Sequence, residues 1–379
     1  MKRVLISGGA GFIGSHLAIR MLQKGWQVRV LDNLSEQIHG SDPSSTSPLF
    51  ASILGKVEFM HGSVTSRDDW ARALADQDVV VHLAAETGTG QSMYFIEKYV
   101  DVNVRGTSIM LDILANVAST VRKVVVASSR AIYGEGKYLS EERGVVYPLQ
   151  RSEADMKAGR FEVTDAGCSA LKLMPTDEES RIHPSSIYGI TKQVQEQLVM
   201  TSCRACGIPA VSFRYQNVYG PGQSLSNPYT GILSIFSSRI LAGLPINVFE
   251  DGLASRDFVY ISDVVAATLA GIESPAADHQ VFNVGSGQQT TVLQVANELA
   301  KLFGRDVPIT VSGMFRVGDI RHNIADLTHL RRTLGFHPQV PFTDGLARFV
   351  AWVQQQNAQT GDYERSLREM QERGLLRGG

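Results

Sequence analysis

Cysteine is scarce in this chain. Only Cys168, Cys203 and Cys206 occur among 379 residues, too few and too unevenly spaced for a framework of disulfide bonds. Cys203 and Cys206 form a CxxC pair, but no second pair completes a four-ligand zinc site. We therefore interpret them as two thiols near the end of a helix, and we expect no bound metal.

Long apolar runs and an excess of charge are also missing. No stretch reaches the roughly 20 apolar residues that cross a bilayer, and residues 1–3 lead into a short apolar run rather than a signal sequence. The net charge of -2 gives no electrostatic reason to bind nucleic acid or a membrane surface. These absences predict a cytoplasmic protein with neither kind of partner.

Short apolar runs alternate with amphipathic stretches through the first half of the chain. This alternation is typical of a parallel sheet covered by helices on both faces, so we predict an α/β fold with a Rossmann-type, doubly wound sheet. The expected strands span residues 4–7, 28–31, 57–60, 79–83, 124–128 and 210–215, and the expected helices span residues 13–23, 100–116 and 187–206.

The length predicts more than one domain, because 379 residues exceed the usual size of about 150. After Tyr215 the alternation loosens into clusters of turn-forming residues. We expect a Rossmann domain at residues 1–215 and a smaller domain at 216–379, from which some segments return to the first. Serine-rich residues 41–48 are expected to form a mobile surface loop, and the polar tail after Val353 a helix or frayed end.

An insertion is predicted ahead of the third expected helix. About 50 residues separate Tyr133 from Ile187, whereas loops in compact α/β units usually have 2 to 6 residues. Residues 137–183 include Val145, Tyr147 and Phe161, and this apolar content predicts a small subdomain or a lid.

Gly8, Gly11 and Gly14 form a glycine motif directly after the first expected strand. Glycines there permit a tight turn and close approach to a pyrophosphate, which a helix N-terminus also attracts. The next strand ends in Asp32, whose carboxylate can bind ribose hydroxyls and would repel a 2′-phosphate. The pattern therefore favours a dinucleotide site over the alternative of a flexible glycine loop and an aspartate that only caps a turn. Within that interpretation, Asp32 favours NAD over NADP.

Tyr188 and Lys192 form a YxxxK motif at the start of the third expected helix, so their side chains share one face. A tyrosine with a pKa near 10 is a poor base, but a neighbouring ammonium and the positive nicotinamide ring both favour its phenolate. In many proteins the same spacing has no catalytic role, and the tyrosine ring simply packs beside an extended lysine side chain. Downstream of a dinucleotide motif, it predicts the oxidation of a hydroxyl group.

Ser128 ends the strand expected at residues 124–128, and Ser129 directly follows it. The carboxyl ends of parallel strands face the ligand crevice of such folds. A serine hydroxyl there can bind the oxygen whose proton Tyr188 removes, although a serine can also simply end a strand.

Together with His82, Asn103 and residues 214–221, these motifs resemble the extended short-chain dehydrogenase/reductases that act on nucleotide sugars. The resemblance spans most of the chain and implies a catalytic triad of Ser129, Tyr188 and Lys192. The residues expected at the NAD cofactor are Gly8, Gly11, Phe12, Ile13, Gly14, Asp32, Asn33, Ser63, Val64, Leu83, Ala84, Ala85, Asn103, Tyr188 and Lys192. The residues expected at the nucleotide sugar are Thr89, Ser129, Arg130, Asn217, Phe249, Arg256, Arg316 and Asp319.

By the same resemblance, Asn217, Arg256 and Arg316 match residues that hold the substrate pyrophosphate. Bidentate guanidinium contacts suit a diphosphate. The alternative for Arg256 is a local ion pair with Asp257.

The residues next to Ser129 narrow the set of reactions that the resemblance allows. Related 4,6-dehydratases carry Thr-Asp-Glu there, whereas this chain has Ser129, Arg130 and Ala131, and it lacks the glutamate of decarboxylating relatives. The same triplet does occur at residues 176–178, in the approach to the Tyr188 helix, where we interpret it as coincidental.

Segments 85–93 and 129–136 and the insertion are similar to those of dTDP-L-rhamnose 4-epimerases. Those relatives carry several cysteines in the insertion, in the manner of a small zinc ribbon, whereas here only Cys168 falls in it. The resemblance predicts an isomerase that epimerises C4 of a dTDP- or UDP-linked deoxyhexose through a transient 4-keto sugar. It also implies a homodimer built on the 100–116 and 187–206 helices.

Three other outcomes stay open. One is a 4-ketoreductase or dehydrogenase of the same fold, and a second is a 4,6-dehydratase. A third is a catalytically silent NAD-binding protein, since a fold does not imply activity.

Overall fold

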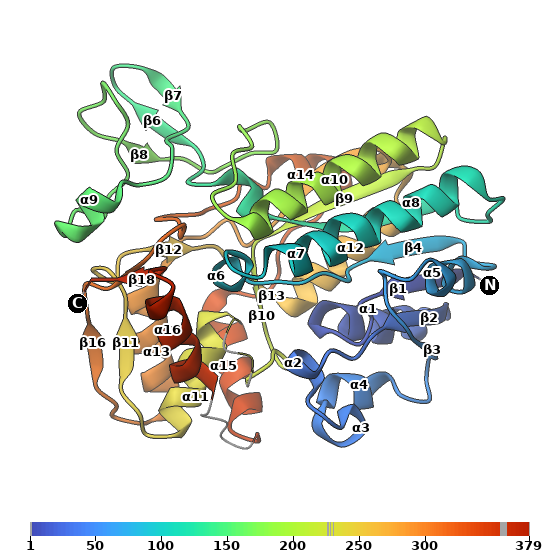
Figure 1. Cartoon of the computed structure of the whole chain (residues 1–379), viewed down its shortest axis with the longest axis horizontal. Coiled ribbons are helices and arrows are strands. Elements are labelled where there is room, and N and C mark those ends of the chain that lie inside the picture. Colours follow the sequence, from blue (N-terminus) through green and yellow to red (C-terminus); the bar gives the residue numbers. More distant parts are fainter. Residues whose placement is uncertain (1, 226, 228, 230, 357–361, 379) are drawn as a thin grey trace.

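The structure is a computed structural model that describes residues 2–225, 227, 229, 231–356 and 362–378. A seven-stranded sheet with helices on both faces forms its largest part. C-terminal elements pack beside that sheet, and a small outlying sheet projects from the rest of the molecule (Figure 1).

All neighbouring strands of the large sheet run parallel, in the order β14-β9-β5-β4-β1-β2-β3. Their bounds are β1 (Arg3–Ser7), β2 (Gln27–Asp32), β3 (Glu58–His61), β4 (Val79–His82), β5 (Lys123–Ser129), β9 (Ala210–Tyr215) and β14 (Gln280–Val284). The six predicted strands are confirmed, and β14 adds a seventh. Between β1 and β4 the direction of winding reverses, which opens a ligand crevice at the carboxyl ends of these strands.

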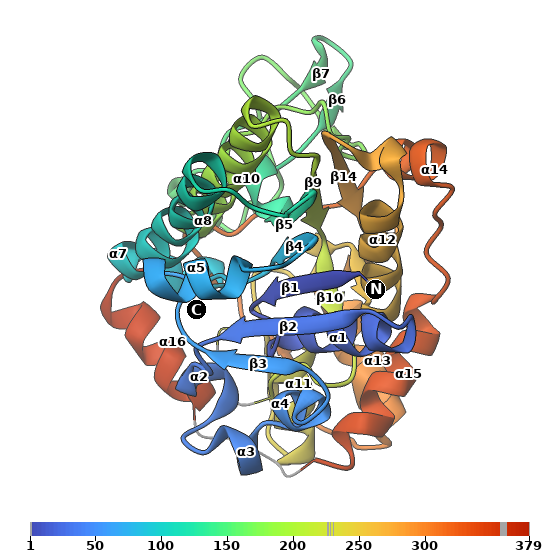
Figure 2. The same cartoon turned by 90° about the vertical axis from the view of Figure 1, so that its right-hand side faces the viewer.

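Alternate residues of each strand point to opposite faces of the sheet. Val4 and Ile6 of β1 pack in one apolar cluster with α1 and α12, whereas Leu5 packs in a second with α5, α8 and α10 (Figure 2). The bounds are α1 (Phe12–Gln23), α5 (Arg67–Leu74), α8 (Gly106–Asn116), α10 (Ile187–Ala205) and α12 (Ile261–Glu273). The predicted Rossmann-type, doubly wound architecture is therefore confirmed.

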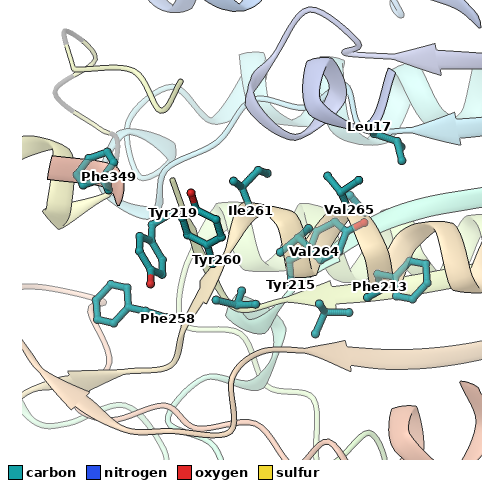
Figure 3. Close-up of a cluster of buried hydrophobic side chains, with 14 of the residues drawn as sticks. Leu17, Phe213, Tyr215, Tyr219, Phe258, Tyr260, Ile261, Val264, Val265 and Phe349 are labelled. Atoms are coloured by element: carbon teal, nitrogen blue, oxygen red, sulfur yellow. The ribbon is translucent and has the colours of Figure 1, made fainter. Parts of the chain in front are cut away.

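One apolar cluster joins the large sheet to the C-terminal elements. Figure 3 shows Phe213 and Tyr215 of β9 beside Val264 of α12, with Tyr219 and Phe258 further along the cluster. The last two lie on β10 (Asn217–Tyr219) and β13 (Phe258–Tyr260), which pair in parallel. The substrate-side elements therefore share a core with the sheet that carries the glycine motif.

The remaining C-terminal elements are short strands and helices. They are α11 (Ile232–Leu241), β11 (Ile246–Val248), β12 (Ser255–Arg256), η3 (Pro275–Ala277), β15 (Thr290–Thr291), α13 (Val292–Phe303), β16 (Ile309–Val311), β17 (Phe315–Arg316), α14 (Thr328–Leu334), α15 (Phe342–Val353), α16 (Asp362–Glu372) and β18 (Leu376–Arg377). In the described part of the tail, a helix and a strand are present, so the frayed end we allowed for is not found there.

The insertion forms an outlying three-stranded sheet in the order β7-β6-β8. Its elements are β6 (Tyr138–Ser140), β7 (Gly144–Val146), α9 (Glu153–Lys157) and β8 (Lys172–Leu173). Tyr138, Val146 and Val163 form its small core, against which Cys168 packs. Of the apolar residues named from the sequence, Val145 is 49% exposed, and Phe161 packs with Phe315 of β17 outside this small core. The domain boundaries given above stay a prediction.

Two local expectations need correction. Residues 41–48 do not form a loop throughout, because α3 (Pro43–Thr46) and α4 (Pro48–Ile53) begin there and the Ser47 hydroxyl accepts from Phe50 N. Serine is a good helix N-cap as well as a loop residue. The expected helix at 100–116 begins with a π-helical stretch, η1 (Val100–Arg105). Other short helices are α2 (Glu36–His39), α6 (Thr89–Ser92), α7 (Ile96–Tyr99) and η2 (Arg130–Tyr133).

Within the described ranges, no helix is both long and apolar enough to pass through a membrane. The three cysteines are free thiols, with Cys203 buried and Cys206 exposed at the end of α10.

Candidate active site

The glycine motif makes the tight turn between β1 and α1. A Cβ on Gly14 would lie 2.3 Å from Gly8 O, so only glycine lets the helix start this close to the turn. Gly11 is the N-cap of α1, and in the described structure no side chain caps this end and no acidic residue lies in its first turn. The amides and the positive end of the helix dipole are therefore available to an anion.

Asp32 lies beside this turn, at the end of β2. One carboxylate oxygen accepts from Ala10 N at 2.9 Å and the other from Leu34 N at 2.9 Å. The buried His39 imidazole lies 4.0 Å from the Asp32 carboxylate. Burial lowers the pKa of His39, and the Asp32 charge opposes that shift. Sequence reasoning missed His39, because no motif marks it.

A cavity of about 370 Å³ opens at the carboxyl ends of the central strands. It brings together nearly all residues predicted at the cofactor and the whole predicted catalytic triad. These lining residues are Gly8, Gly11, Phe12, Ile13, Gly14, Asp32, Asn33, Ser63, Val64, Leu83, Ala84, Ala85, Ser129, Tyr188 and Lys192. Gln37 and His39 of α2 also line it and were not predicted.

Asn103 is fully buried and does not belong to the residues that line the cavity. Its amide nitrogen donates to Glu86 O at 3.1 Å and to Thr191 Oγ1 at 3.0 Å, and its amide oxygen accepts from Glu86 N at 2.8 Å. Asn103 therefore holds the segment after β4 against α10. A direct contact with the cofactor stays a prediction.

Tyr188 lies in the first turn of α10, whose N-cap Ser186 accepts from Gly189 N at 3.1 Å. Tyr188 N donates to Ser92 Oγ at 3.0 Å. Burial raises the pKa of Tyr188, while Ser129 and the charge of Arg130 lower it. The phenol and the serine hydroxyl thus line the same cavity, and the charge of Arg130 acts on the phenol from outside its lining.

Lys192 lies one turn further along α10, and its ammonium donates to Gln195 Oε1. The Gln195 amide nitrogen lies 3.0 Å from His82 Nε2 and donates to Thr107 Oγ1 at 2.9 Å. Burial lowers the pKa of Lys192 to about 7, and the nearby Glu196 carboxylate opposes the shift. Burial, with the Lys192 charge, also lowers the pKa of His82 to about 3, so this imidazole is neutral.

The predicted phosphate residue Arg256 lies beside Asp319. Its guanidinium is 2.9 Å from the Asp319 carboxylate and also donates to Arg321 O and Ile320 O. The alternative, an ion pair between Arg256 and Asp257, is therefore wrong. The Asp257 carboxylate instead accepts from backbone amides such as Gly287 N.

Arg130 and Arg316 lie near the same carboxylate. Burial raises the pKa of Asp319, but the charges of Arg256, Arg316 and Arg130 outweigh it and hold that pKa below its usual range. Burial and Arg256 lower the pKa of Arg130 to about 10. Arg316 lies over the Phe249 ring at 4.8 Å. Three cations around one carboxylate leave an excess of positive charge that suits a diphosphate.

A second pocket, of only about 10 Å³, lies at the start of α10, where Ser186 lines it, and contains three of the predicted substrate residues, Thr89, Arg316 and Asp319. Asn217, Phe249, Arg256 and Arg130 do not line either cavity. Asn217 N donates to Asp257 O at 2.9 Å, so this residue is tied to the strand that carries Arg256.

The triplet at residues 176–178 lies away from this chemistry. Asp177 pairs with Lys137 of the insertion, and the Glu178 carboxylate accepts from Asn283 N of β14 at 2.6 Å. None of the three belongs to the described residues that line the two cavities, as the coincidental interpretation requires.

These features define a class of protein: a dinucleotide-binding enzyme with a Ser-Tyr-Lys site beside a cluster of arginines. The sequence profile of the NAD dependent epimerase/dehydratase family matches residues 4–154 and 163–285. The chain belongs to this family, and its cofactor is NAD.

Individual relatives cover almost the whole chain. A dTDP-L-rhamnose 4-epimerase from Burkholderia thailandensis is 37% identical over 94% of this chain and 96% of its own length. A UDP-glucose 4-epimerase from Thermotoga maritima, solved with UDP-glucose, is 30% identical with a TM-score of 0.74, covering 93% of this chain and 98% of its own. A UDP-glucuronic acid 4-epimerase from Bacillus cereus, solved with UDP-glucuronic acid and NAD, is 25% identical with a TM-score of 0.76, covering 93% and 99%.

Proposed function

We propose that this chain catalyses the reversible 4-epimerisation of a nucleotide-linked 6-deoxyhexose, with dTDP-L-rhamnose as substrate. The observation that carries the reaction type is the joint placement of Ser129, Tyr188 and Lys192 in the cavity that the glycine turn and Asp32 also line. The relative that is 37% identical over 94% of the chain supports the choice of sugar.

The cavity fits NAD on three counts. The capless start of α1 offers amides to the pyrophosphate, Asp32 offers a carboxylate to the ribose, and Tyr188 and Lys192 line the same space. When bound, NAD would supply reversible hydride transfer at C4 of the sugar.

Tyr188 is proposed to remove the proton from the sugar O4 and to return it at the end of the cycle. Lys192 favours the phenolate through its positive charge, and Ser129 donates a hydrogen bond to the reacting oxygen. Ser129 and Tyr188 line the same cavity, and Ser129 lowers the pKa of the Tyr188 phenol.

Arg256 and Arg316 are proposed to hold the diphosphate while the 4-keto sugar rotates within the site. A single anchor at the diphosphate leaves the sugar free to present its opposite face. Arg130 and Asp319 complete this charged end of the site.

The residues beside Ser129 favour epimerisation over dehydration. Loss of water at C5 and C6 needs an acid and a base near the sugar, and the corresponding positions hold Arg130 and Ala131. The carboxylates at 177 and 178 are occupied by Lys137 and by the backbone of β14.

The test is turnover of dTDP-L-rhamnose by purified enzyme without added cofactor, followed by NMR of the product. We expect the C4 epimer to appear and no net consumption of NAD. UDP-glucose and UDP-glucuronic acid serve as comparison substrates. A requirement for stoichiometric NADH or NADPH would contradict epimerisation and support the 4-ketoreductase.

Tyr188→Phe should reduce kcat by at least about 100-fold, within the usual range for a general acid–base group, and should leave NAD bound. Tyr147→Phe is the matched control, because Tyr147 packs against His183 and lines neither cavity. Unchanged turnover by the Tyr188 variant would refute the mechanism.

A further inference from the structure

The C-terminal segment of the chain forms one side of the small pocket at the start of α10. Met370 of α16 and Leu375, just ahead of β18, line it together with Met93, Val317, Thr89 and Ser186. Ser186 is the N-cap of the helix that carries Tyr188, and Arg316 lies in the same pocket. The pocket, of only about 10 Å³, therefore adjoins the start of the helix that carries Tyr188 and contains one of the proposed diphosphate arginines, so it has room for a small substituent of the sugar rather than for the ring.

Contacts on two sides fix this segment in place. On one side β18 pairs with β17, the strand that carries Arg316, and Val317 N donates to Leu375 O at 2.9 Å. On the other side the Glu369 carboxylate accepts from Tyr229 Oη at 2.8 Å and from Tyr94 Oη at 3.3 Å. The segment therefore contacts β17, which carries Arg316, on one side, and Tyr94 and Tyr229 on the other.

A cation–π contact strengthens the second attachment. The Arg373 guanidinium lies 4.5 Å from the centre of the Tyr94 ring. Arg373 directly follows α16 and Tyr94 directly follows Met93, so this contact joins the C-terminal segment to the neighbour of another pocket residue. Because both ends of the segment are attached, its side chains form a wall with a defined shape.

The wall is apolar, whereas the rest of the pocket is polar. Met370 is 4% exposed, and a Cβ on Gly90 would come within 3.3 Å of its sulfur. Met370, Leu375, Met93 and Val317 offer only thioether and alkyl groups, which are at best weak hydrogen-bond partners. The polar side holds Thr89, Ser186, Arg316 and Asp319.

We infer that the C-terminal segment selects the substituent at C6 of the sugar, with Met370 and Leu375 receiving a C6 methyl group. A hydroxyl or carboxylate at C6 would lose its water against this wall and gain no hydrogen bond in return. The site therefore favours 6-deoxyhexoses over hexoses and hexuronic acids. This inference rests on the proposed function for the placement of the sugar.

The test compares dTDP-L-rhamnose with dTDP-L-mannose, which differ only in the C6 hydroxyl. Affinities are measured by titration calorimetry on NAD-loaded Tyr188→Phe enzyme, which binds without turning over. We expect the background enzyme to prefer the rhamnose derivative by about tenfold or more. Met370→Gln and, separately, Leu375→Gln should bring the two affinities within about threefold, mainly by tightening the mannose derivative.

Leu367→Gln is the control, because Leu367 lies half-buried on the same helix and outside the pocket. Thermal melting and NAD content establish that each variant is folded. An unchanged ratio in both pocket variants, or equal affinity of the background enzyme for the two sugars, would overturn the inference. If the wild-type enzyme epimerises neither sugar, the proposed function fails, while the affinity ratio still decides the role of the wall.

Discussion

At the scale of single residues, Lys192 depends on a partner that the YxxxK motif does not contain. Gln195 Oε1 accepts from the buried ammonium, and the amide nitrogen of the same side chain is engaged by His82 and Thr107. Since the neutral His82 accepts at Nε2, its Nδ1–H is directed to Ser7 Oγ at 2.6 Å. These bonds fix the orientation of the amide, with its oxygen toward Lys192.

Removing this oxygen should change the titration of Lys192. Burial lowers the pKa of Lys192 to about 7, so its ammonium is present below that pH and is lost as the pH rises through it. Gln195→Leu removes a hydrogen bond that favours the charged form, and the pKa should fall further by about half a unit to one unit. NMR of labelled lysine in the cofactor-free enzyme measures this, with the signal assigned by its loss in Lys192→Met.

Gln195→Glu is the opposite control, because a carboxylate at the same place favours the ammonium and should raise the pKa of Lys192. Turnover by Gln195→Leu should also fall at alkaline pH before that of the wild type, since the phenolate of Tyr188 needs the ammonium. Identical titrations in the Leu and Glu variants would show that Gln195 does not act on Lys192.

Much of the site could be predicted from residues that are close together in the sequence. Gly8 directly follows a strand, Asp32 and Ser129 each end one, and Tyr188 lies in the first turn of a helix, so each motif indicates where its residue lies. His39, Gln195 and Met370 could not be found in this way. They reach the site through tertiary packing, from a short helix, a buried helix face and the C-terminal tail.

At the scale of elements, the β1–α1 turn sets a steric limit that the cofactor site depends on. A Cβ on Gly14 would lie 2.3 Å from Gly8 O and 2.6 Å from Gly9 Cα, both of which are backbone atoms that cannot move alone. Gly14→Ala should therefore displace α1 from the turn and destabilise the fold by about 1–3 kcal/mol. Thermal melting and NAD affinity, which should fall at least tenfold, measure the effect.

Gly25→Ala separates this clash from the general effect of replacing a glycine. Gly25 has a φ of +78° but has no atom within 4 Å of the added Cβ, so only backbone strain of about 1 kcal/mol is expected. Its NAD affinity should stay at the wild-type level. Equal NAD affinities in the two variants would show that the turn tolerates a side chain at position 14.

The pattern of apolar residues predicted local elements better than long-range pairing. Val4, Leu5 and Ile6 are apolar in succession because both faces of β1 are covered, which is typical of a parallel strand. β14 pairs with β9 from some 65 residues further along the chain, and no local signal marks such a partner. The serines at 41–48 were misread because the same residue type favours loops and helix caps.

At the scale of the whole molecule, buried charges attach the insertion to the C-terminal elements. Arg151 of the insertion pairs with Glu250 at 2.8 Å, and Glu250 also pairs with the fully buried Arg321 at 3.0 Å. Arg321 in turn bonds Glu162 of the insertion. Asp319 and Arg321 are two residues apart, so this network lies next to the proposed diphosphate site and gives the insertion a fixed position beside it.

The expected homodimer has a candidate surface on the helices beside the large sheet. Phe95, Ile96 and Val100 are 42–49% exposed along α7 and η1, and Ile190 is 44% exposed on the adjoining α10. Apolar side chains grouped on neighbouring helices are typical of an interface between subunits. Val100 and Ile190 lie on the two helices, expected at 100–116 and 187–206, from which the resemblance predicts the dimer contact, whereas Phe95 and Ile96 precede the first of them.

Replacing Val100 and Ile190 by glutamate should convert a dimer into a monomer, because two like charges from each subunit would be buried against each other. Sedimentation velocity measures the change, and NAD content shows whether each subunit stays folded. Leu253→Glu is the matched control, since Leu253 is 50% exposed in the loop ahead of β12, far in sequence from these helices. A monomeric wild-type enzyme, or a dimer that survives the double substitution, would rule out this interface.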